Sequence, residues 1–184
     1  MNSKVFTSRF WFVLSVILAG AAMRLVPHWP NFTPIAAIAL FGGAYMSKKY
    51  LAFIIPLAAL FLSDLLLGFH NTMPAVYISF VITVALGMYM LRNPKILNVL
   101  GASITSTVLF FLITNFAAWL GSPFYPQNFA GLMESYIAGL AFFNNGTYGI
   151  SFLMNSLLGD LLYTGIFFGA FYLARLRFPV LARS

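Results

Sequence analysis

The chain has 184 residues, of which 61% are hydrophobic and only 7% are charged, and its mean hydropathy is +0.92. So few polar residues cannot cover a soluble globule of this size, and the apolar runs approach the ~20 residues that cross a bilayer. The formal charge of +7 lies in short turns and a C-terminal tail, where membrane topology explains it without a nucleic acid partner. We therefore expect an integral membrane protein that binds no nucleic acid.

Apolar segments, taken in chain order, predict six transmembrane helices. The predicted spans are Phe10–Val26, Phe32–Met46, Leu51–Phe69, Ala75–Leu91, Ile96–Leu120 and a last span that ends at Ala174. The first span has some features of a signal peptide, but its removal would leave five spans and would separate Arg24 from its expected partners. The second span is short for a bilayer. The expected fold is an all-α, single-domain bundle of six transmembrane helices over residues 1–184.

Basic residues lie almost entirely on one side of this predicted bundle. Nine of the ten are Lys4, Arg9, Lys48, Lys49, Arg92, Lys95, Arg175, Arg177 and Arg183. Excess lysine and arginine in short loops marks the cytoplasmic face. We therefore expect both termini to be cytoplasmic and the protein to be a multi-pass component of a bacterial cytoplasmic (inner) membrane.

The longest connection, Gly121–Ser156, is predicted on the external side. It contains prolines, aromatic residues and an apolar stretch, Gly131–Phe143, that reads as an interfacial or re-entrant helix. A connection of this length in a compact protein usually carries function. We expect it to form a lid or a binding element.

Three charged residues are predicted at one depth on three different helices. Arg24 lies 15 residues after Arg9, Asp64 lies 15 after Lys49, and Asp160 lies 15 before Arg175. At about 1.5 Å per residue, each is roughly 22 Å above its cytoplasmic anchor. Ionisable groups in a bilayer normally face the bundle interior and pair with one another, so these three should meet. Either they tie the helices together, or they also form the floor of an outward-facing site.

Amide and aromatic side chains gather above this charged level. Seven of the ten asparagines fall in the external half, and amides with aromatic faces suit an organic ligand of little charge. Part of the aromatic content is also explained by the belt of rings at a membrane interface. The candidate ligand-binding residues are Arg24, His28, Asn31, Phe32, Asp64, His70, Asn115, Trp119, Tyr125 and Asp160.

Other chemistries have weaker sequence support. The absence of cysteine excludes disulfides and thiolate ligands, and His28 and His70 are too far apart in sequence to form a metal-binding motif, so no metal and no cofactor is predicted. No nucleotide-binding P-loop is present. The segment Leu158-Gly159-Asp160 resembles part of the Gly-x-Gly-Asp motif of intramembrane aspartyl proteases, but Leu157 stands in place of the first glycine.

Three segments carry a resemblance to a known group of proteins. Arg24–Tyr45, Leu62–Phe69 and Leu158–Tyr163 resemble an uncharacterised bacterial family of membrane transport proteins. That family is similar to the S-components of energy-coupling factor (ECF) vitamin transporters. The first resemblance covers nearly the whole chain, whereas the second rests on size, on six spans, and on a small-residue second span followed by an Asp near the outer end of the third.

The resemblance implies a protein that captures a vitamin or related micronutrient from outside and is not an enzyme. It would deliver the ligand by toppling on a shared transmembrane subunit that is driven by two ATPases. S-components dock on that subunit through small residues of the first helix, which correspond here to Ser15, Ala19 and Ala22. Ordinary packing within the bundle explains small residues at these positions equally well. Some S-components bind vitamin B12 with a cysteine; here His28 or His70 would have to take that place. The alternative function is a non-transporting scaffold of cell-envelope assembly.

Overall fold

The computed structural model describes residues 6–141 and 151–182. These residues form seven α-helices and one short 3-10 helix, without a β-strand, which confirms the all-α prediction. The helices are α1 (Ser8–Met23), α2 (Ile35–Tyr45), α3 (Lys49–Leu67), α4 (Met73–Met90), α5 (Ile96–Gly121), α6 (Phe129–Ala141), α7 (Phe152–Arg177) and the 3-10 helix η1 (Pro179–Ala182).

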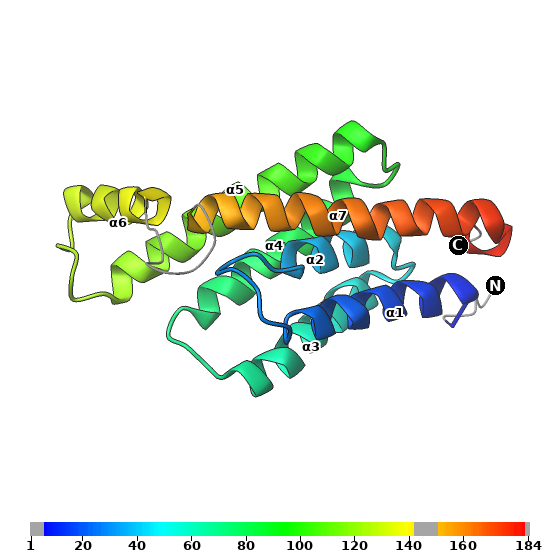
Figure 1. The fold of residues 1–184 in the computed structure, drawn as a ribbon, viewed down its shortest axis with the longest axis horizontal. Coiled ribbons are helices and arrows are strands. Elements are labelled where there is room, and N and C mark those ends of the chain that lie inside the picture. Colours follow the sequence, from blue (N-terminus) through cyan, green and yellow to red (C-terminus); the bar gives the residue numbers. More distant parts are fainter. Residues whose placement is uncertain (1–5, 142–150, 183–184) are drawn as a thin grey trace.

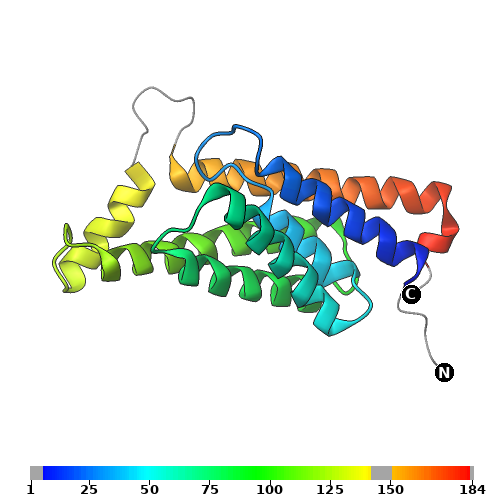
Figure 2. The same cartoon turned by 90° about the horizontal axis from the view of Figure 1, so that it is seen from below.

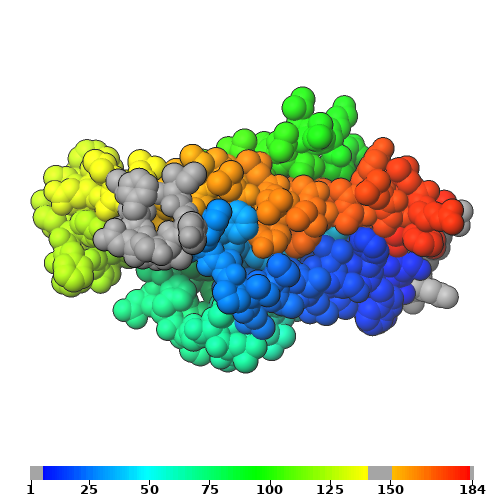
Figure 3. Space-filling view, in the orientation of Figure 1, coloured from blue at the N-terminus to red at the C-terminus, as the bar shows by residue number. Residues whose placement is uncertain are grey.

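Four of these helices, α3, α4, α5 and α7, are long and apolar enough to cross a membrane. Large apolar side chains cover their outer surfaces; Leu66, Ile96 and Leu173 are 73%, 76% and 65% exposed. Such surfaces are stable against lipid tails rather than water. The protein is therefore a helical membrane protein, with an elongated body along which α7 runs (Figure 3).

Helix α2 lies in the centre of the bundle. It packs against α1, α3, α4, α5 and α7, and eight of its 11 residues are buried. A helix that is apolar on every side is expected in such a position. At about 1.5 Å per residue, α2 is roughly half as long as the ~30 Å hydrocarbon core of a bilayer is thick. The second predicted span is therefore a short central helix that does not cross the bilayer by itself.

Close contact between α2 and α4 depends on two glycines. A Cβ atom on Gly43 would meet the carbonyl oxygen of Val84, and one on Gly87 would meet the backbone of Leu40. Only hydrogen atoms fit between the two backbones at this crossing. Small residues permit this close approach of membrane helices, whose association depends on van der Waals packing.

The turns with basic residues gather at one end of the molecule. The start of α1, the turn between α2 and α3, the turn between α4 and α5, and the end of α7 lie together there (Figures 1 and 2). Nearby, η1 packs against both α7 and α1. This arrangement agrees with the side assigned to these residues from sequence, while Lys4 and Arg183 lie outside the described residues.

Helix α6 occupies the opposite end, beside the last turns of α5 (Figures 1 and 2). The Ser135 hydroxyl donates to the Asn115 carbonyl (3.1 Å) and the Tyr136 hydroxyl to the Leu112 carbonyl (3.1 Å). The middle of the predicted lid is thus an apolar helix held on α5. Positions 142–150, with Asn144 and Asn145, lie outside the described residues, and α7 already begins at Phe152, so the last residues of the predicted lid are helical.

Candidate functional site

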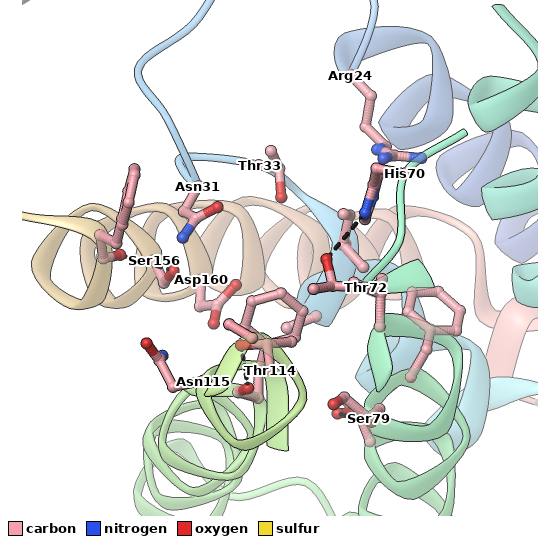
Figure 4. Close-up of a pocket in the computed structure, with 18 of the residues that line it drawn as sticks. Arg24, Asn31, Thr33, His70, Thr72, Ser79, Thr114, Asn115, Ser156 and Asp160 are labelled. Atoms are coloured by element: carbon pink, nitrogen blue, oxygen red, sulfur yellow. Dashed lines mark hydrogen bonds between the residues drawn. The ribbon is translucent and has the colours of Figure 1, made fainter. Parts of the chain in front are cut away.

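A cavity of about 440 Å³ opens at the end of the bundle away from the basic turns. Its walls come from the loops after α1 and α3, the N-terminal end of α2, and the facing sides of α4, α5 and α7 (Figure 4). The lining residues are Arg24, His28, Asn31, Thr33, Ile35, Ala36, His70, Thr72, Val76, Ser79, Phe80, Thr83, Phe110, Thr114, Asn115, Ala118, Phe152, Ser156 and Asp160.

The short length of α2 explains why this space exists. Pro34 is the N-cap residue of α2, and the preceding Asn31 has a positive φ of 62°, a conformation that asparagine tolerates better than most residues. The chain therefore leaves the helix axis before α2 reaches the end of the bundle. The cavity takes up the volume that further turns of α2 would otherwise fill, so the longer α4, α5 and α7 become its walls.

The loop before α2 is held against α7. Asn155 donates from Nδ2 to the carbonyl of Pro30 (3.0 Å), and Gly159 lets the backbone of Phe32 and Thr33 approach closely. The ring of Phe32 packs edge-on against Trp29 and Tyr163. Phe32, predicted to bind ligand, is therefore absent from the cavity lining and instead anchors the loop that forms one wall.

Arg24 forms the predicted ion pair with Asp64. Its Nη1 lies 2.8 Å from Asp64 Oδ1 and also donates to the Ser63 hydroxyl and the Leu60 carbonyl (3.4 Å). Tyr77 donates its hydroxyl to the other oxygen of Asp64 (2.8 Å). Asp64 therefore lies behind the cavity wall and neutralises Arg24, which itself faces the cavity.

Asp160 does not join this pair, contrary to the prediction that all three charged residues meet. Its Oδ2 accepts a hydrogen bond from Thr107 on α5 (2.6 Å), and the only salt bridge within the described residues is Arg24–Asp64. A position along a helix does not specify the direction of a side chain around it. The two groups instead line the same cavity from different sides.

Both histidines lie at the rim of the cavity. His28 Nδ1 is 2.6 Å from the carbonyl of Val26, and His70 Nδ1 is 2.9 Å from the hydroxyl of Thr72. Figure 4 shows the hydrogen bond between His70 and Thr72. Within the described residues no group of three potential metal ligands occurs.

Two predicted amides reach the cavity. Asn31 makes no hydrogen bond with the described part of the chain through its side chain, and Figure 4 places it on the same side as Asp160 and Ser156. Asn115 donates from Nδ2 to the carbonyl of Phe111 (2.9 Å), and its Oδ1 lies against Gly139 of α6. Asn115 thus links the cavity wall to α6.

Trp119 and Tyr125, also predicted to bind ligand, are absent from the lining. The indole of Trp119 donates to the carbonyl of Pro126 (2.8 Å), and Gln127 donates to the carbonyls of Trp119 and Tyr125. These residues shape the loop between α5 and α6. Of the expected lid, Phe152 and Ser156 are the described residues that contribute to the lining, both from α7.

Residues 4–181 match a family model described as a family of unknown function, DUF6580. The chain belongs to the DUF6580 family. No curated protein and no solved structure matches it.

Hydroxyl groups are the part of this DUF6580 cavity that sequence reasoning missed. Ser79, Thr83, Thr114 and Ser156 each donate a hydrogen bond to the carbonyl four residues earlier in their own helix. Serine and threonine are common in membrane helices, so composition does not single them out. The sequence signal that could have indicated them is the spacing of hydroxyl residues by three to four positions, as in Ser79 and Thr83, which places them on one face of α4.

The small residues predicted for docking lie on the outer side of the DUF6580 bundle. Ser15, Ala19 and Ala22 are exposed, whereas Val13 and Ile17 of the same helix are buried. Packing within the bundle therefore does not account for the stripe. The outer surface of α1 presents it to lipid or to another protein.

Proposed function

We propose that this protein binds a small organic micronutrient at the external side of the bacterial cytoplasmic membrane and presents it for uptake, as an S-component does. The observation that carries the proposal is the cavity of about 440 Å³ at the end opposite the basic turns. Ligand sites typically measure about 300–1,000 Å³ and combine apolar walls with a few polar groups.

The cavity lining supports a compact ring-containing ligand. Phe80, Phe110 and Phe152 provide ring surfaces, and Asn31 and Asn115 provide amides. Aromatic faces and directed hydrogen bonds together select an organic molecule over an inorganic ion. A vitamin or a cofactor precursor has this chemistry.

An energy source must come from other subunits in this proposal, because the sequence contains no P-loop. The exposed stripe of Ser15, Ala19 and Ala22 supports docking of α1 on a transmembrane subunit that carries ATPases. The surrounding bilayer would then be the medium in which the bundle reorients.

The carboxylates give less support to an intramembrane aspartyl protease. Such an enzyme needs two carboxyl groups that share a proton. Asp64 is hydrogen-bonded to Arg24 and Tyr77, and Asp160 to Thr107. Within the described residues no hydrogen bond connects the two Asp side chains.

The proposal is tested by ligand binding to the purified chain. Mass spectrometry of protein purified in mild detergent should find a co-purified small molecule, and a thermal-shift screen of vitamins and their precursors should find a compound that raises the melting temperature. A ligand at 100 times its dissociation constant stabilises the folded state by about 2.7 kcal/mol. Asn115→Leu should reduce this shift, whereas Asn98→Leu, on the exposed opposite end of α5, should not.

A scaffold of cell-envelope assembly predicts a different result. It would bind no small molecule and would co-purify with envelope proteins. Equal shifts in wild type, Asn115→Leu and Asn31→Leu would place the site outside this cavity.

A further inference from the structure

The helical walls of the cavity present hydrogen-bond acceptors. Ser79, Thr83, Thr114 and Ser156 line it, and each hydroxyl uses its single hydrogen within its own helix. A hydroxyl whose hydrogen is already donated offers a neighbour only its lone pairs. These walls of α4, α5 and α7 therefore require donors from whatever binds there.

Asp160 is the strongest of these acceptors. The residue is only 6% exposed, yet it lines the cavity. The Thr107 hydroxyl lies 2.6 Å from Oδ2 and 3.0 Å from the carbonyl of Ser103, so these two acceptors share its single hydrogen. Oδ1 has no hydrogen-bond partner among the described residues and is not one of their buried unpartnered atoms, so it is open to the cavity. Figure 4 shows the carboxylate directed away from α7, towards α5.

The charges around the cavity do not compensate Asp160. The guanidinium of Arg24 is paired with Asp64 at 2.8 Å, so this pair contributes no net charge. The remaining groups with ring nitrogens, His28 and His70, are held at the exposed rim by Val26 and Thr72. A buried carboxylate without a counter-charge is costly in a medium of low dielectric constant.

We infer that the cavity selects a ligand with a basic, N–H-donating group, such as a primary amine, an amidine or an aminated heterocycle, and that this group binds the free oxygen of Asp160. The hydroxyl acceptors of α4, α5 and α7 receive its further N–H groups. Arg24 and Asn31, on the loop side, donate to acceptor atoms at the other end of the ligand. This inference rests on the proposed function and specifies the substrate class of the same site.

The negative character of the cavity can be measured without a known ligand, because the chain has no native cysteine. Thr114→Cys places a thiol in the lining, and Phe124→Cys, at a position that is 87% exposed, serves as the matched control outside it. Each thiol is reacted with cationic 2-aminoethyl methanethiosulfonate and with anionic 2-sulfonatoethyl methanethiosulfonate. The ratio of the cation rate to the anion rate should be about tenfold higher at Thr114→Cys than at Phe124→Cys, since a negative charge in the same cavity acts on the two reagents in opposite directions.

Adding Asp160→Asn should remove that preference at Thr114→Cys and leave the ratio at Phe124→Cys unchanged. Thr107→Val keeps the carboxylate but deletes its structural hydrogen bond, so it should retain the preference. Loss of the preference in Thr107→Val as well would mean that local packing, rather than the charge of Asp160, sets the ratio. If the two single-cysteine variants that retain Asp160 show equal ratios of cation rate to anion rate, the inference is overturned, even if Asp160→Asn does not fold.

Matched compounds then test ligand class. Pyridoxamine and pyridoxine, and likewise cytosine and uracil, differ mainly in an amino group, and only the aminated members should raise the melting temperature. Stabilisation by neutral or acidic compounds that depends on Asn115 would refute this ligand class and leave the proposed function intact. If the Thr114→Cys thiol prefers the cationic reagent but no micronutrient raises the melting temperature, the proposed function is refuted, while the negative charge assigned to Asp160 stands.

Discussion

Arg24 combines a structural role with a place in the cavity wall. Its side chain is 11% exposed, and all its hydrogen bonds to the described residues leave from Nη1 towards α3. Within those residues, its buried Nε has no partner. The pair with Asp64 therefore fixes the end of α1 on α3, while the rest of the guanidinium stays next to the cavity.

Removal of Arg24 should destabilise the protein strongly. Arg24→Ala leaves the carboxylate of Asp64, which is 4% exposed, without its counter-charge, at a cost of about 3–5 kcal/mol. Arg175→Ala is the control, since that exposed arginine lies over the ring of Tyr172 (5.4 Å) and is worth at most about 1 kcal/mol. Thermal melts in detergent measure the difference.

The double variant Arg24→Ala/Asp64→Asn should recover part of the loss, because it leaves no unpaired charge. Equal melting temperatures for Arg24→Ala and Arg175→Ala would contradict the coupling.

At the scale of helices, the short central α2 organises both the packing and the cavity. Its C-terminal half meets α4 through Gly43 and Gly87, and its N-terminal end contributes Ile35 and Ala36 to the cavity lining. The tight crossing holds α2 at a fixed depth. Because α2 is held at this depth and begins only after Pro34, the space beyond its N-terminal end stays open as the cavity.

Gly87→Ala should weaken the crossing of α2 and α4. A Cβ atom there would meet the backbone of Leu40, which cannot rotate away, and such overpacking costs about 1–3 kcal/mol. Gly101→Ala is the matched control, because a Cβ atom at Gly101 in α5 has no atom within 4 Å and the change should stabilise by roughly 0.5–1 kcal/mol. A melting temperature for Gly87→Ala at or above that of Gly101→Ala would show that the helices are further apart than described.

At the scale of the whole molecule, the two ends of the bundle differ in chemistry. Arg9, Lys48, Arg92 and Arg175 lie at the start of α1, in the turns before α3 and α5, and at the end of α7, and these segments gather at one end of the molecule (Figure 1). The cavity is lined from the opposite ends of these helices. Lysine and arginine in short loops remain on the cytoplasmic side during insertion. The cavity is therefore expected to open outward.

Single cysteines report this orientation directly. Ser47→Cys, in the exposed turn between α2 and α3, should be protected from a membrane-impermeant thiol reagent in intact cells, because we expect that turn to be cytoplasmic. Asn71→Cys and Asn128→Cys, in exposed loops near the other end, should be labelled. All three should react after the membrane is permeabilised, and labelling of Ser47→Cys in intact cells would reverse the proposed orientation.

The sequence by itself determined the helical membrane class, the approximate ends of the helices and the contact between Arg24 and Asp64. Apolar length, basic turns and the fixed rise of a helix are local properties, so Arg24 and Asp64 were correctly paired. The direction of each side chain around its helix depends on how the helices pack, and only the tertiary structure decided that Asp160 turns towards Thr107. The tertiary structure likewise decided the cavity. Its volume and its hydroxyl lining arise where the N-terminal end of the short α2 lies beside longer helices from distant parts of the chain.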